Sequence, residues 1–311
     1  MKNWPLAVVA AGAASLAGAY LETKAFVLRR VDVPVLPPGC DDVRVLHISD
    51  LHLTPGQRRK LEWLRSLADL APDLVVNTGD NLAHSASVAP LLDALGPLLA
   101  RPGVFVNGSN DYWAPVPKNP ARYLMADPRR KMVDPTPLPW PDMVDGFTSA
   151  GWADLNNHRA TVTLADGRRL SFVGTDDPHL EWDVMPAPDE AGGTDEADKA
   201  ALLHIGVTHA PYQRVLNQFR DDGARLILAG HTHGGQLRLP GVGALVTNCD
   251  LDRRRAAGLS GWPGARPSSP LGKDSVWLHV SAGAGTSPYT PFRLFCRPEA
   301  TLLTLTAPPA A

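Results

Sequence analysis

Side chains that could bind metal ions recur at the ends of apolar runs in this sequence. They are Asp50, His52, Asp80, Asn110, His209, His231 and His233. A single aspartate after a strand usually caps a helix, and a single histidine is usually a satisfied polar residue. Recurrence at equivalent strand ends makes chance a poor explanation. Carboxylate oxygens with imidazole nitrogens suit manganese, iron or zinc at hydrolytic centres, where two ions about 3.5 to 4 Å apart can share one carboxylate.

Two groups of these residues repeat one spacing. They are Asp50-x-His52 and His231-x-His233. Side chains alternate along an extended segment, so residues two apart point to the same side. Neighbouring glycines such as Gly230 allow the backbone to turn tightly near a metal or a phosphate.

The elements that carry these residues are apolar runs alternating with helical patterns. Runs that predict buried strands cover residues 43–49, 73–80, 103–111, 201–211, 224–235, 275–285 and 300–307. Residues 61–70 and 88–99 have apolar residues at helical spacing. An Asp-Gly turn within 160–174 indicates a hairpin. This alternation predicts a layered α/β fold with functional groups at the carboxyl ends of the strands.

The first 42 residues differ in composition from the rest. Residues 3–21 carry no charge and are about long enough to cross a bilayer as a helix. We expect an N-terminal transmembrane anchor or signal-like segment at 1–30, and hence a membrane-associated protein, with a cleaved signal peptide or a soluble helix as alternatives. Residues 31–42 predict an extended linker. The folded domain is expected at 43–308, with an irregular insertion at about 114–151.

The balance of charge argues against one class of partner. Thirty basic and 32 acidic residues give a formal net charge of −2. Proteins that bind nucleic acid normally show a basic excess or stripe, so no nucleic-acid polymer is expected as a partner. The three cysteines are widely spaced, which indicates neither a disulfide framework nor a cysteine zinc site.

Four motifs, in this order, resemble those of the calcineurin-like metallophosphoesterases. They are Ser49–His52 (SDLH), Thr78–Asp80 (TGD), Thr208–Pro211 (THAP) and Ala229–Gln236 (AGHTHGGQ). The similarity spans roughly residues 43–306 and extends to a membrane-associated bacterial branch of the family. It implies an α/β fold built as a layered sandwich of two mixed β-sheets flanked by helices.

The resemblance also implies a ligand set for two divalent metal ions. One ion would be bound by Asp50, His52 and His233, Asp80 would bridge, and the second would be bound by Asn110, His209 and His231. The ions would lower the pKa of a water molecule that attacks phosphorus in line and would stabilise charge on the phosphoryl oxygens.

One motif departs from the family pattern. The family usually reads Gly-Asn-His followed by an acid, whereas this chain has Gly108-Ser109-Asn110-Asp111. Either Ser109 replaces the ligand and Asn110 the histidine, or the turn shifts so that Asn110 still reaches the metal. We favour the shift because an amide oxygen is the better ligand. His84 could take over part of the catalytic role of the missing histidine, the alternative being a surface histidine at a helix start.

Contacts with the substrate are expected from the irregular segments. Arg129 and Arg130, with Lys131, could bind a phosphate or anionic lipid headgroups, or form a solvated charge cluster. Tyr112 and Trp113 could stack on a base or sugar or cover an acyl chain, or they could only pack the insertion.

The predicted function is hydrolysis of a phosphodiester or pyrophosphate in a phosphorylated small molecule, possibly lipid-linked or nucleotide-containing. Without the family histidine, leaving groups that depart unprotonated are favoured. Two alternatives come from other classes: a membrane-tethered scaffold that binds metal but catalyses weakly, and a phosphomonoesterase or protein phosphatase.

Overall fold

The computed structural model describes residues 4–117, 135–188 and 201–308. Two six-stranded sheets form its centre. The first sheet has the order β1 (Val27–Pro34), β14 (Glu299–Thr306), β2 (Val43–Ile48), β3 (Leu74–Asn77), β4 (Gly103–Phe105) and β5 (Ala153–Asp154). The second has the order β12 (Gly258–Trp262), β13 (Val276–Val280), β9 (Leu226–Ala229), β8 (Leu203–Thr208), β7 (Arg169–Gly174) and β6 (Arg159–Thr163).

Both sheets mix parallel and antiparallel pairs. In the first, β2 to β5 run parallel to one another and β14 is antiparallel to β2. In the second, β13, β9, β8 and β7 are parallel, and the edge strands β12 and β6 are antiparallel to their neighbours. The parallel strands of each sheet therefore end at one edge, where functional groups can gather.

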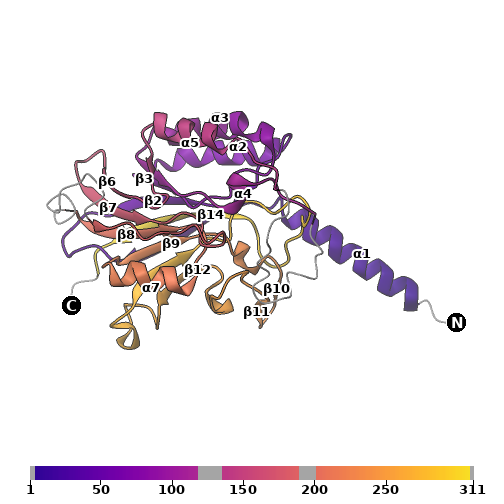
Figure 1. Ribbon diagram of the computed structural model, residues 1–311. Helices are drawn as coiled ribbons and strands as arrows, with labels where there is room; N and C mark the ends of the chain where they lie inside the picture. Colours follow the sequence, from indigo (N-terminus) through magenta and orange to yellow (C-terminus); the bar gives the residue numbers. More distant parts are fainter. Residues whose placement is uncertain (1–3, 118–134, 189–200, 309–311) are drawn as a thin grey trace.

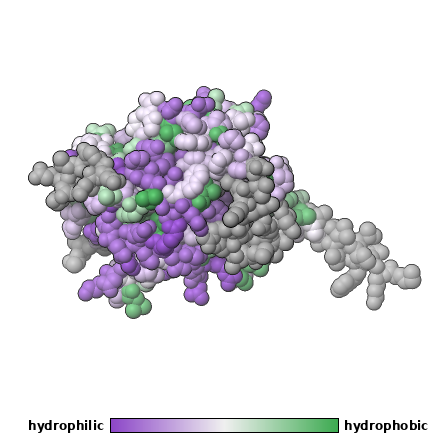
Figure 2. Space-filling view, in the orientation of Figure 1, coloured by the Kyte–Doolittle hydropathy of each residue, from purple (hydrophilic) through white to green (hydrophobic). Residues whose placement is uncertain are grey.

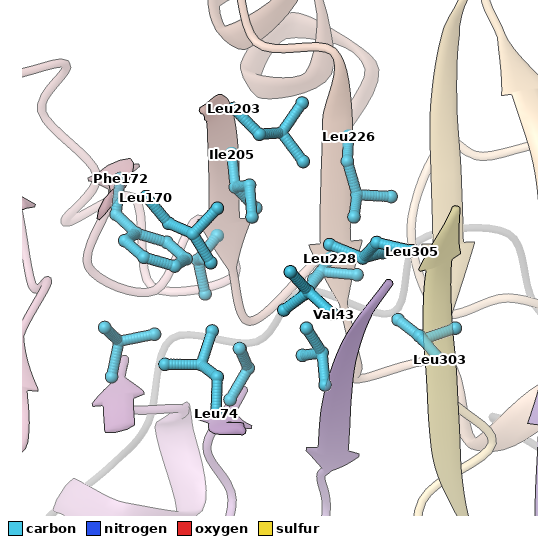
Figure 3. Packing of buried hydrophobic residues seen from close by; sticks show 14 of the residues in the cluster. Val43, Leu74, Leu170, Phe172, Leu203, Ile205, Leu226, Leu228, Leu303 and Leu305 are labelled. Atoms are coloured by element: carbon cyan, nitrogen blue, oxygen red, sulfur yellow. The ribbon is translucent and has the colours of Figure 1, made fainter. Parts of the chain in front are cut away.

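The main hydrophobic core lies between the two sheets (Figure 3). Side chains alternate along a strand, so one strand serves two layers. In β2, Val43 and Val45 join the core between the sheets, whereas Leu46 and Ile48 join a second core against helices. A mostly apolar run such as β2 thus forms a strand that packs on both faces.

Helices cover the outer face of each sheet (Figure 1). α2 (Arg58–Ser66), α3 (Val88–Leu99) and α5 (Trp140–Ser149) lie over the first sheet, and α7 (Gln213–Asp221) lies over the second. Leu91, Leu95 and Leu98 of α3 recur at helical spacing and are fully buried. The predicted layered sandwich of two mixed β-sheets flanked by helices is confirmed.

The remaining elements are short. They are α4 (Ser109–Tyr112), the hairpin β10 (Arg238–Leu239) and β11 (Gly243–Ala244), and the 3₁₀ helices η1 (Leu67–Leu70), η2 (Ser85–Ser87), η5 (His233–Gly235), η6 (Arg253–Arg255) and η7 (Pro270–Gly272).

The residues coloured in Figure 2 present a largely hydrophilic face with small, separate hydrophobic areas.

The N-terminal region differs from its prediction. Helix α1 (Trp4–Glu22) extends away from the sandwich (Figure 1), and the described residues contain no helix that is long and apolar enough to cross a membrane. The predicted transmembrane helix is therefore not supported. The expected linker at 31–42 begins inside β1, which pairs in parallel with β14 along its whole length. The strand forms because it pairs with β14. The local sequence did not predict it, because β14 lies at the other end of the chain.

The expected insertion at about 114–151 is partly regular. α5 occupies its last third, and Met143 and Phe147 of this helix are fully buried against the first sheet and its helices. Pro139 is the N-cap residue of α5 and Pro141 lies in the first helical turn, where a missing N–H costs no hydrogen bond. Arg129, Arg130 and Lys131 lie outside the described residues.

Candidate metal centre

The predicted ligands follow parallel strands of both sheets, and hydrogen bonds join the two groups. Asp50 and Asp80 follow β2 and β3 of the first sheet, while His209 and His231 follow β8 and β9 of the second. The backbone N–H of His231 donates to both carboxylate oxygens of Asp50, at 3.2 and 3.1 Å. The Nδ1 atom of His209 lies 2.6 Å from the carbonyl oxygen of Thr78. The strand ends of both sheets thus converge on one site.

Five of the predicted ligands have left-handed backbone conformations. Their φ angles are 49° for Asp50, 41° for His52, 55° for Asp80, 66° for His231 and 50° for His233. Such conformations cost about 1 to 3 kcal/mol each for non-glycine residues, and they concentrate at functional sites. Backbone hydrogen bonds between the turns hold the first two, since the N–H groups of Asp50 and His52 donate to the carbonyls of Gly79 and Asp80 at 2.8 and 2.9 Å. These strained conformations lower the stability of the fold, and they orient the five side chains toward the site.

Four of the side chains form a compact cluster. Ligand atoms of Asp50, His52, Asp80 and His233 all lie within 4.8 Å of one another, and all four residues are buried. The Nε2 atoms of His52 and His233 are 3.2 Å apart, and Nε2 of His233 is 3.6 Å from Oδ1 of Asp50. Two imidazoles and two carboxylates at this spacing form a donor set suited to a divalent transition metal.

Asp80 contacts both predicted ligand groups. Its Oδ2 atom lies 3.4 Å from Nε2 of His52 and 3.5 Å from Nε2 of His209. The backbone N–H of Asn110 donates to Oδ1 at 2.8 Å, and the Asn110 amide lies 2.7 Å from Oδ2. Asp80 therefore belongs to the four-residue cluster and also contacts Asn110 and His209.

The ring hydrogens of three histidines point away from the cluster. A backbone carbonyl can only accept, so it requires a hydrogen on the ring nitrogen that it contacts. The contacts are Nδ1 of His209 with Thr78, Nε2 of His231 with Asn248 at 3.2 Å, and Nδ1 of His233 with Gly285 at 3.2 Å. In each neutral ring the other nitrogen is left with a lone pair. Histidines that bind metals almost always donate their second N–H to such a carbonyl or to a carboxylate.

Several buried polar atoms have no hydrogen-bond partner among the described residues. They include Nε2 of His209 and Nδ1 of His52. Nε2 of His209 lies 3.5 Å from the Asp80 carboxylate, and a cation shared between them, either a proton or a metal ion, would satisfy both groups. The residues present therefore fit a divalent metal ion.

Burial controls the protonation of the histidines. Desolvation lowers the pKa of His52 to about 4 and holds the pKa values of His231 and His233 well below the ordinary range. These rings are therefore neutral, which is the form that binds metals. Burial also lowers the pKa of His209, but the charge and hydrogen bond of Asp80 together with the charges of Asp177 and Asp50 outweigh it and raise that pKa well above its usual value. Asp80 thus attracts a positive charge to this point.

The carboxylates respond in opposite directions. Burial, with the charge of Asp80, raises the pKa of Asp50 to about 6, although His209 opposes the shift. For Asp80 burial is outweighed by the charges and hydrogen bonds of His209, His52 and Asn110, which hold its pKa well below the usual range. Asp80 is therefore the permanently ionised member of the pair.

The departing turn brings Asn110 to the cluster. Asn110 lies within hydrogen-bond distance of both Asp80 oxygens, whereas the Ser109 hydroxyl has a 3.5 Å contact with the Asn110 amide. Asn107 instead donates from Nδ2 to the Tyr112 hydroxyl at 3.2 Å. This position of Asn110 agrees with the shifted turn, and its role as a ligand stays a prediction.

Three other predicted residues are placed in different surroundings. His84 is exposed, and its Nδ1 accepts the N–H of Ala86 at 3.0 Å at the start of η2, as in the alternative interpretation. Tyr112 is buried, donates to Asp176 at 2.8 Å and packs edge-to-face against Trp182. Trp113 also contacts the Trp182 ring. The described contacts of these residues are those of a helix cap and an aromatic cluster.

Two buried acids at the site were not assigned a role from the sequence. Asp111 accepts N–H groups from Asp80 and Gly108 on Oδ2 and from Asn81 and Leu82 on Oδ1, at 2.7 to 3.2 Å. Its place in the departing motif was the one available signal. Burial, with the charge of Asp80, raises its pKa to about 7.

Asp177 is the second of these acids. It follows β7, and its Oδ2 is buried without a partner among the described residues. Burial raises its pKa to about 7, with Asp80 adding to the effect and His209 opposing it. The Asp-Asp pair at Asp176 and Asp177 directly after a strand was a signal that could have indicated it.

Comparisons with known proteins agree with this geometry. A model of the family described as calcineurin-like phosphoesterase matches residues 43–235, more than half of the chain. The uncharacterized metallophosphoesterase YkuE of Bacillus subtilis is 25% identical over 290 residues, covering 87% of this chain and 82% of its own. The phosphodiesterase YaeI of Escherichia coli is 28% identical over 293 residues, covering 92% and 90%.

A third relative is longer. The transmembrane protein with metallophosphoesterase domain of Bos taurus is 29% identical over 324 residues, which cover 98% of this chain and 62% of the relative. Three findings support one conclusion. They are the match to the family model, the two-sheet fold, and the buried cluster of Asp50, His52, Asp80 and His233. The chain belongs to the calcineurin-like phosphoesterase family and is a metallophosphoesterase.

Proposed function

We propose that this chain uses a dinuclear metal centre to hydrolyse a phosphodiester or a pyrophosphate. The observation that carries the proposal is the position of Asp80, whose Oδ2 lies 3.4 Å from Nε2 of His52 and 3.5 Å from Nε2 of His209. A carboxylate that contacts ligands from two groups is suited to bridge two ions.

The ligand sets follow from these contacts. Asp50, His52 and His233 would hold one divalent ion together with Asp80, while Asn110, His209 and His231 would hold the second. Such a pair of ions activates water at neutral pH and stabilises the charge of the transferred phosphoryl group. Manganese, iron and zinc all suit mixed nitrogen and oxygen donors.

The residues of the chain supply orientation. Carbonyl groups of Thr78, Asn248 and Gly285 fix the ring hydrogens of the three histidines. The N–H of Asn110 holds Oδ1 of Asp80, which leaves Oδ2 directed at the histidines. Rigid donors of this kind require little reorganisation during the reaction.

The class of substrate follows from what the turn lacks. The turn Gly108-Ser109-Asn110-Asp111 contains no histidine, so it offers no imidazolium beside Asp80 to protonate a leaving group. Leaving groups that depart as anions, such as phosphates from a pyrophosphate or an acidic alcohol from a diester, are therefore favoured. The E. coli relative is named a phosphodiesterase. We extend the proposal to lipid-linked or nucleotide-containing substrates.

Membrane association is a further part of the proposal. The bovine relative is named a transmembrane protein, and α1 extends from the sandwich. Fractionation of the full chain with membranes, compared with a chain that lacks residues 1–22, would test it. Equal partition of both chains into the soluble fraction would contradict it.

The function is tested by metal content and hydrolysis together. The full chain should bind close to two Mn²⁺ per chain and should hydrolyse bis-p-nitrophenyl phosphate faster than p-nitrophenyl phosphate. Asp80→Asn, which keeps the size of the side chain but removes its charge, should lose bound metal and activity. Asp145→Asn, at an exposed position of α5, is the matched control.

Other outcomes would favour other functions. Bound metal without turnover of either ester or of a nucleotide-sugar pyrophosphate would favour the scaffold, and preference for the monoester would favour a phosphomonoesterase. His84→Ala should keep full activity, because His84 caps η2 at the surface. A large fall in turnover for that variant would restore it as a catalytic candidate. No bound metal in the wild type would refute the dinuclear centre.

A further inference from the structure

A buried cation lies behind the candidate metal centre. Arg293, between β13 and β14, is fully buried, and among the described residues no carboxylate forms an ion pair with it. Its Nη2 donates to the carbonyls of Ala282, Gly283 and Gly285 at 2.7, 3.1 and 2.7 Å, and its Nη1 to that of Cys296 at 3.2 Å. Burying a guanidinium costs desolvation free energy, and the hydrogen bonds to these carbonyls offset part of that cost.

The hydrogen bonds of Arg293 lead to a predicted metal ligand. The Gly285 carbonyl that accepts from Arg293 also accepts from Nδ1 of His233 at 3.2 Å, so it fixes the orientation of that ring. The 3.5 Å contact of Nη2 with Nδ1 of His233 is then an approach of two donors. The Cys296 thiol donates to the backbone carbonyl of His233 at 3.3 Å. Residues 293–296 thus contact both parts of His233: Arg293 shares the Gly285 carbonyl with the ring, and Cys296 donates to the backbone carbonyl.

The same segment is bound to the N-terminal helix. The Glu22 carboxylate, at the end of α1, accepts the N–H groups of Phe295 and Cys296 at 3.0 and 2.5 Å. The N–H of Arg293 donates to the carbonyl of Ala19 at 2.9 Å. The last-turn carbonyls of a helix have no partner within it, so this bond also completes the end of α1.

We propose that Glu22 is a positioning residue for the metal ligand His233, acting through residues 293–296 and the buried Arg293. The inference rests on the proposed metal function. α1 is then a support of the metal centre in addition to any role in location. Loss of the Glu22 contacts would free the N–H groups of Phe295 and Cys296 and loosen the segment that orders Gly285 and His233.

The expected size follows from other outer partners of metal ligands. Removing such a partner typically lowers metal affinity by about 10- to 100-fold. Glu22 acts two contacts away from His233, so the lower end of that range is expected for Glu22→Ala. Arg293→Lys, which keeps the charge but loses the fork that binds several carbonyls, should cost at least as much.

The test uses the full chain and Co²⁺, which reports ligand geometry through its visible absorption. Affinity is measured by calorimetry for the wild type, Glu22→Ala, Arg293→Lys and the double variant. Glu62→Ala, at an exposed position of α2, is the matched control. The thermal midpoint of each metal-free protein is measured alongside as a readout of structure alone.

Three results support the inference together. Glu22→Ala should bind Co²⁺ more weakly by about 10-fold and shift its absorption, whereas Glu62→Ala should do neither. The double variant should lose less than the sum of the single losses, because both residues act through one segment. If Arg293→Lys does not fold, the affinity and spectrum of Glu22→Ala still decide.

Two results overturn it and can be told apart. Wild-type affinity and absorption in Glu22→Ala would refute the positioning role alone, and a fall only in its thermal midpoint would do the same. A wild-type chain that binds no Co²⁺ would refute the proposed metal function and this inference with it.

Discussion

Gly108→Ala would test how closely Asp80 and His209 approach each other. A methyl group at Gly108 would collide with Oδ1 of Asp80 and lie 2.7 Å from both Nε2 and Cε1 of His209. Asp80 is 2% exposed and His209 is fully buried, so neither side chain can move into solvent. The variant therefore forces two predicted ligands apart without changing either.

The magnitude follows from two terms. Overpacking a well-packed interior costs about 1 to 3 kcal/mol. Moving Asp80 also breaks its 2.8 Å hydrogen bond from the Asn110 N–H, and hydrogen bonds to charged groups contribute about 1.5 to 3 kcal/mol. Together the free energy of unfolding should fall by about 2.5 to 6 kcal/mol.

Urea unfolding of the metal-free protein measures the change, and calorimetry with Mn²⁺ measures the loss of metal affinity. Gly18→Ala is the matched control, because Gly18 is an exposed residue of α1 and its added methyl group would meet no atom within 4 Å. That control should be neutral or slightly stabilising, since alanine favours helix by about 0.5 to 1 kcal/mol. Unchanged stability and metal affinity in Gly108→Ala would refute the close approach of Asp80 and His209.

Two further predictions concern acids at the site. Burial raises the pKa of Asp50 to about 6, so protons compete with metal for Asp50 below that pH, and Mn²⁺ affinity should fall as the pH drops through about 6. A flat profile from about pH 5 to about pH 8 would contradict the assignment of Asp50 as a ligand. Asp111→Ala removes the acceptor of four buried N–H groups and should lower the free energy of unfolding by at least about 2 kcal/mol in a urea titration; a change as small as that of Asp145→Asn would refute this role.

The local pattern of the sequence predicted the layers of the fold. Strands packed on both faces, such as β2, are mostly apolar over their whole length, and a helix packed on a sheet, such as α3, must repeat its leucines at helical spacing. Those constraints act within a few residues of each other, so they are visible without tertiary contacts. The same locality hid β1, whose partner β14 lies at the other end of the chain.

The candidate ligands could be predicted in the same way, because a metal site needs particular donor atoms at the ends of strands. The four motifs contain Asp50, His52, Asp80 and His233, whose ligand atoms lie within 4.8 Å of one another in the structure. The residues that support the ligands could not be predicted from residue type. Asp111 holds the backbone of Asp80 and Arg293 contacts the carbonyl that orients His233, and these contacts depend on which atoms the fold places beside the two side chains.

The sequence by itself determined which chemical groups stand at the strand ends and which layers bury the apolar runs. Tertiary structure alone decided that Asp80 contacts both His52 and His209, that Tyr112 packs in an aromatic cluster, and that Glu22 reaches the segment behind His233. The physical reason is the distance along the chain over which each effect acts. Propensity and periodicity act between neighbours in the chain, whereas hydrogen bonds, desolvation and charge coupling depend on atoms that only packing brings together.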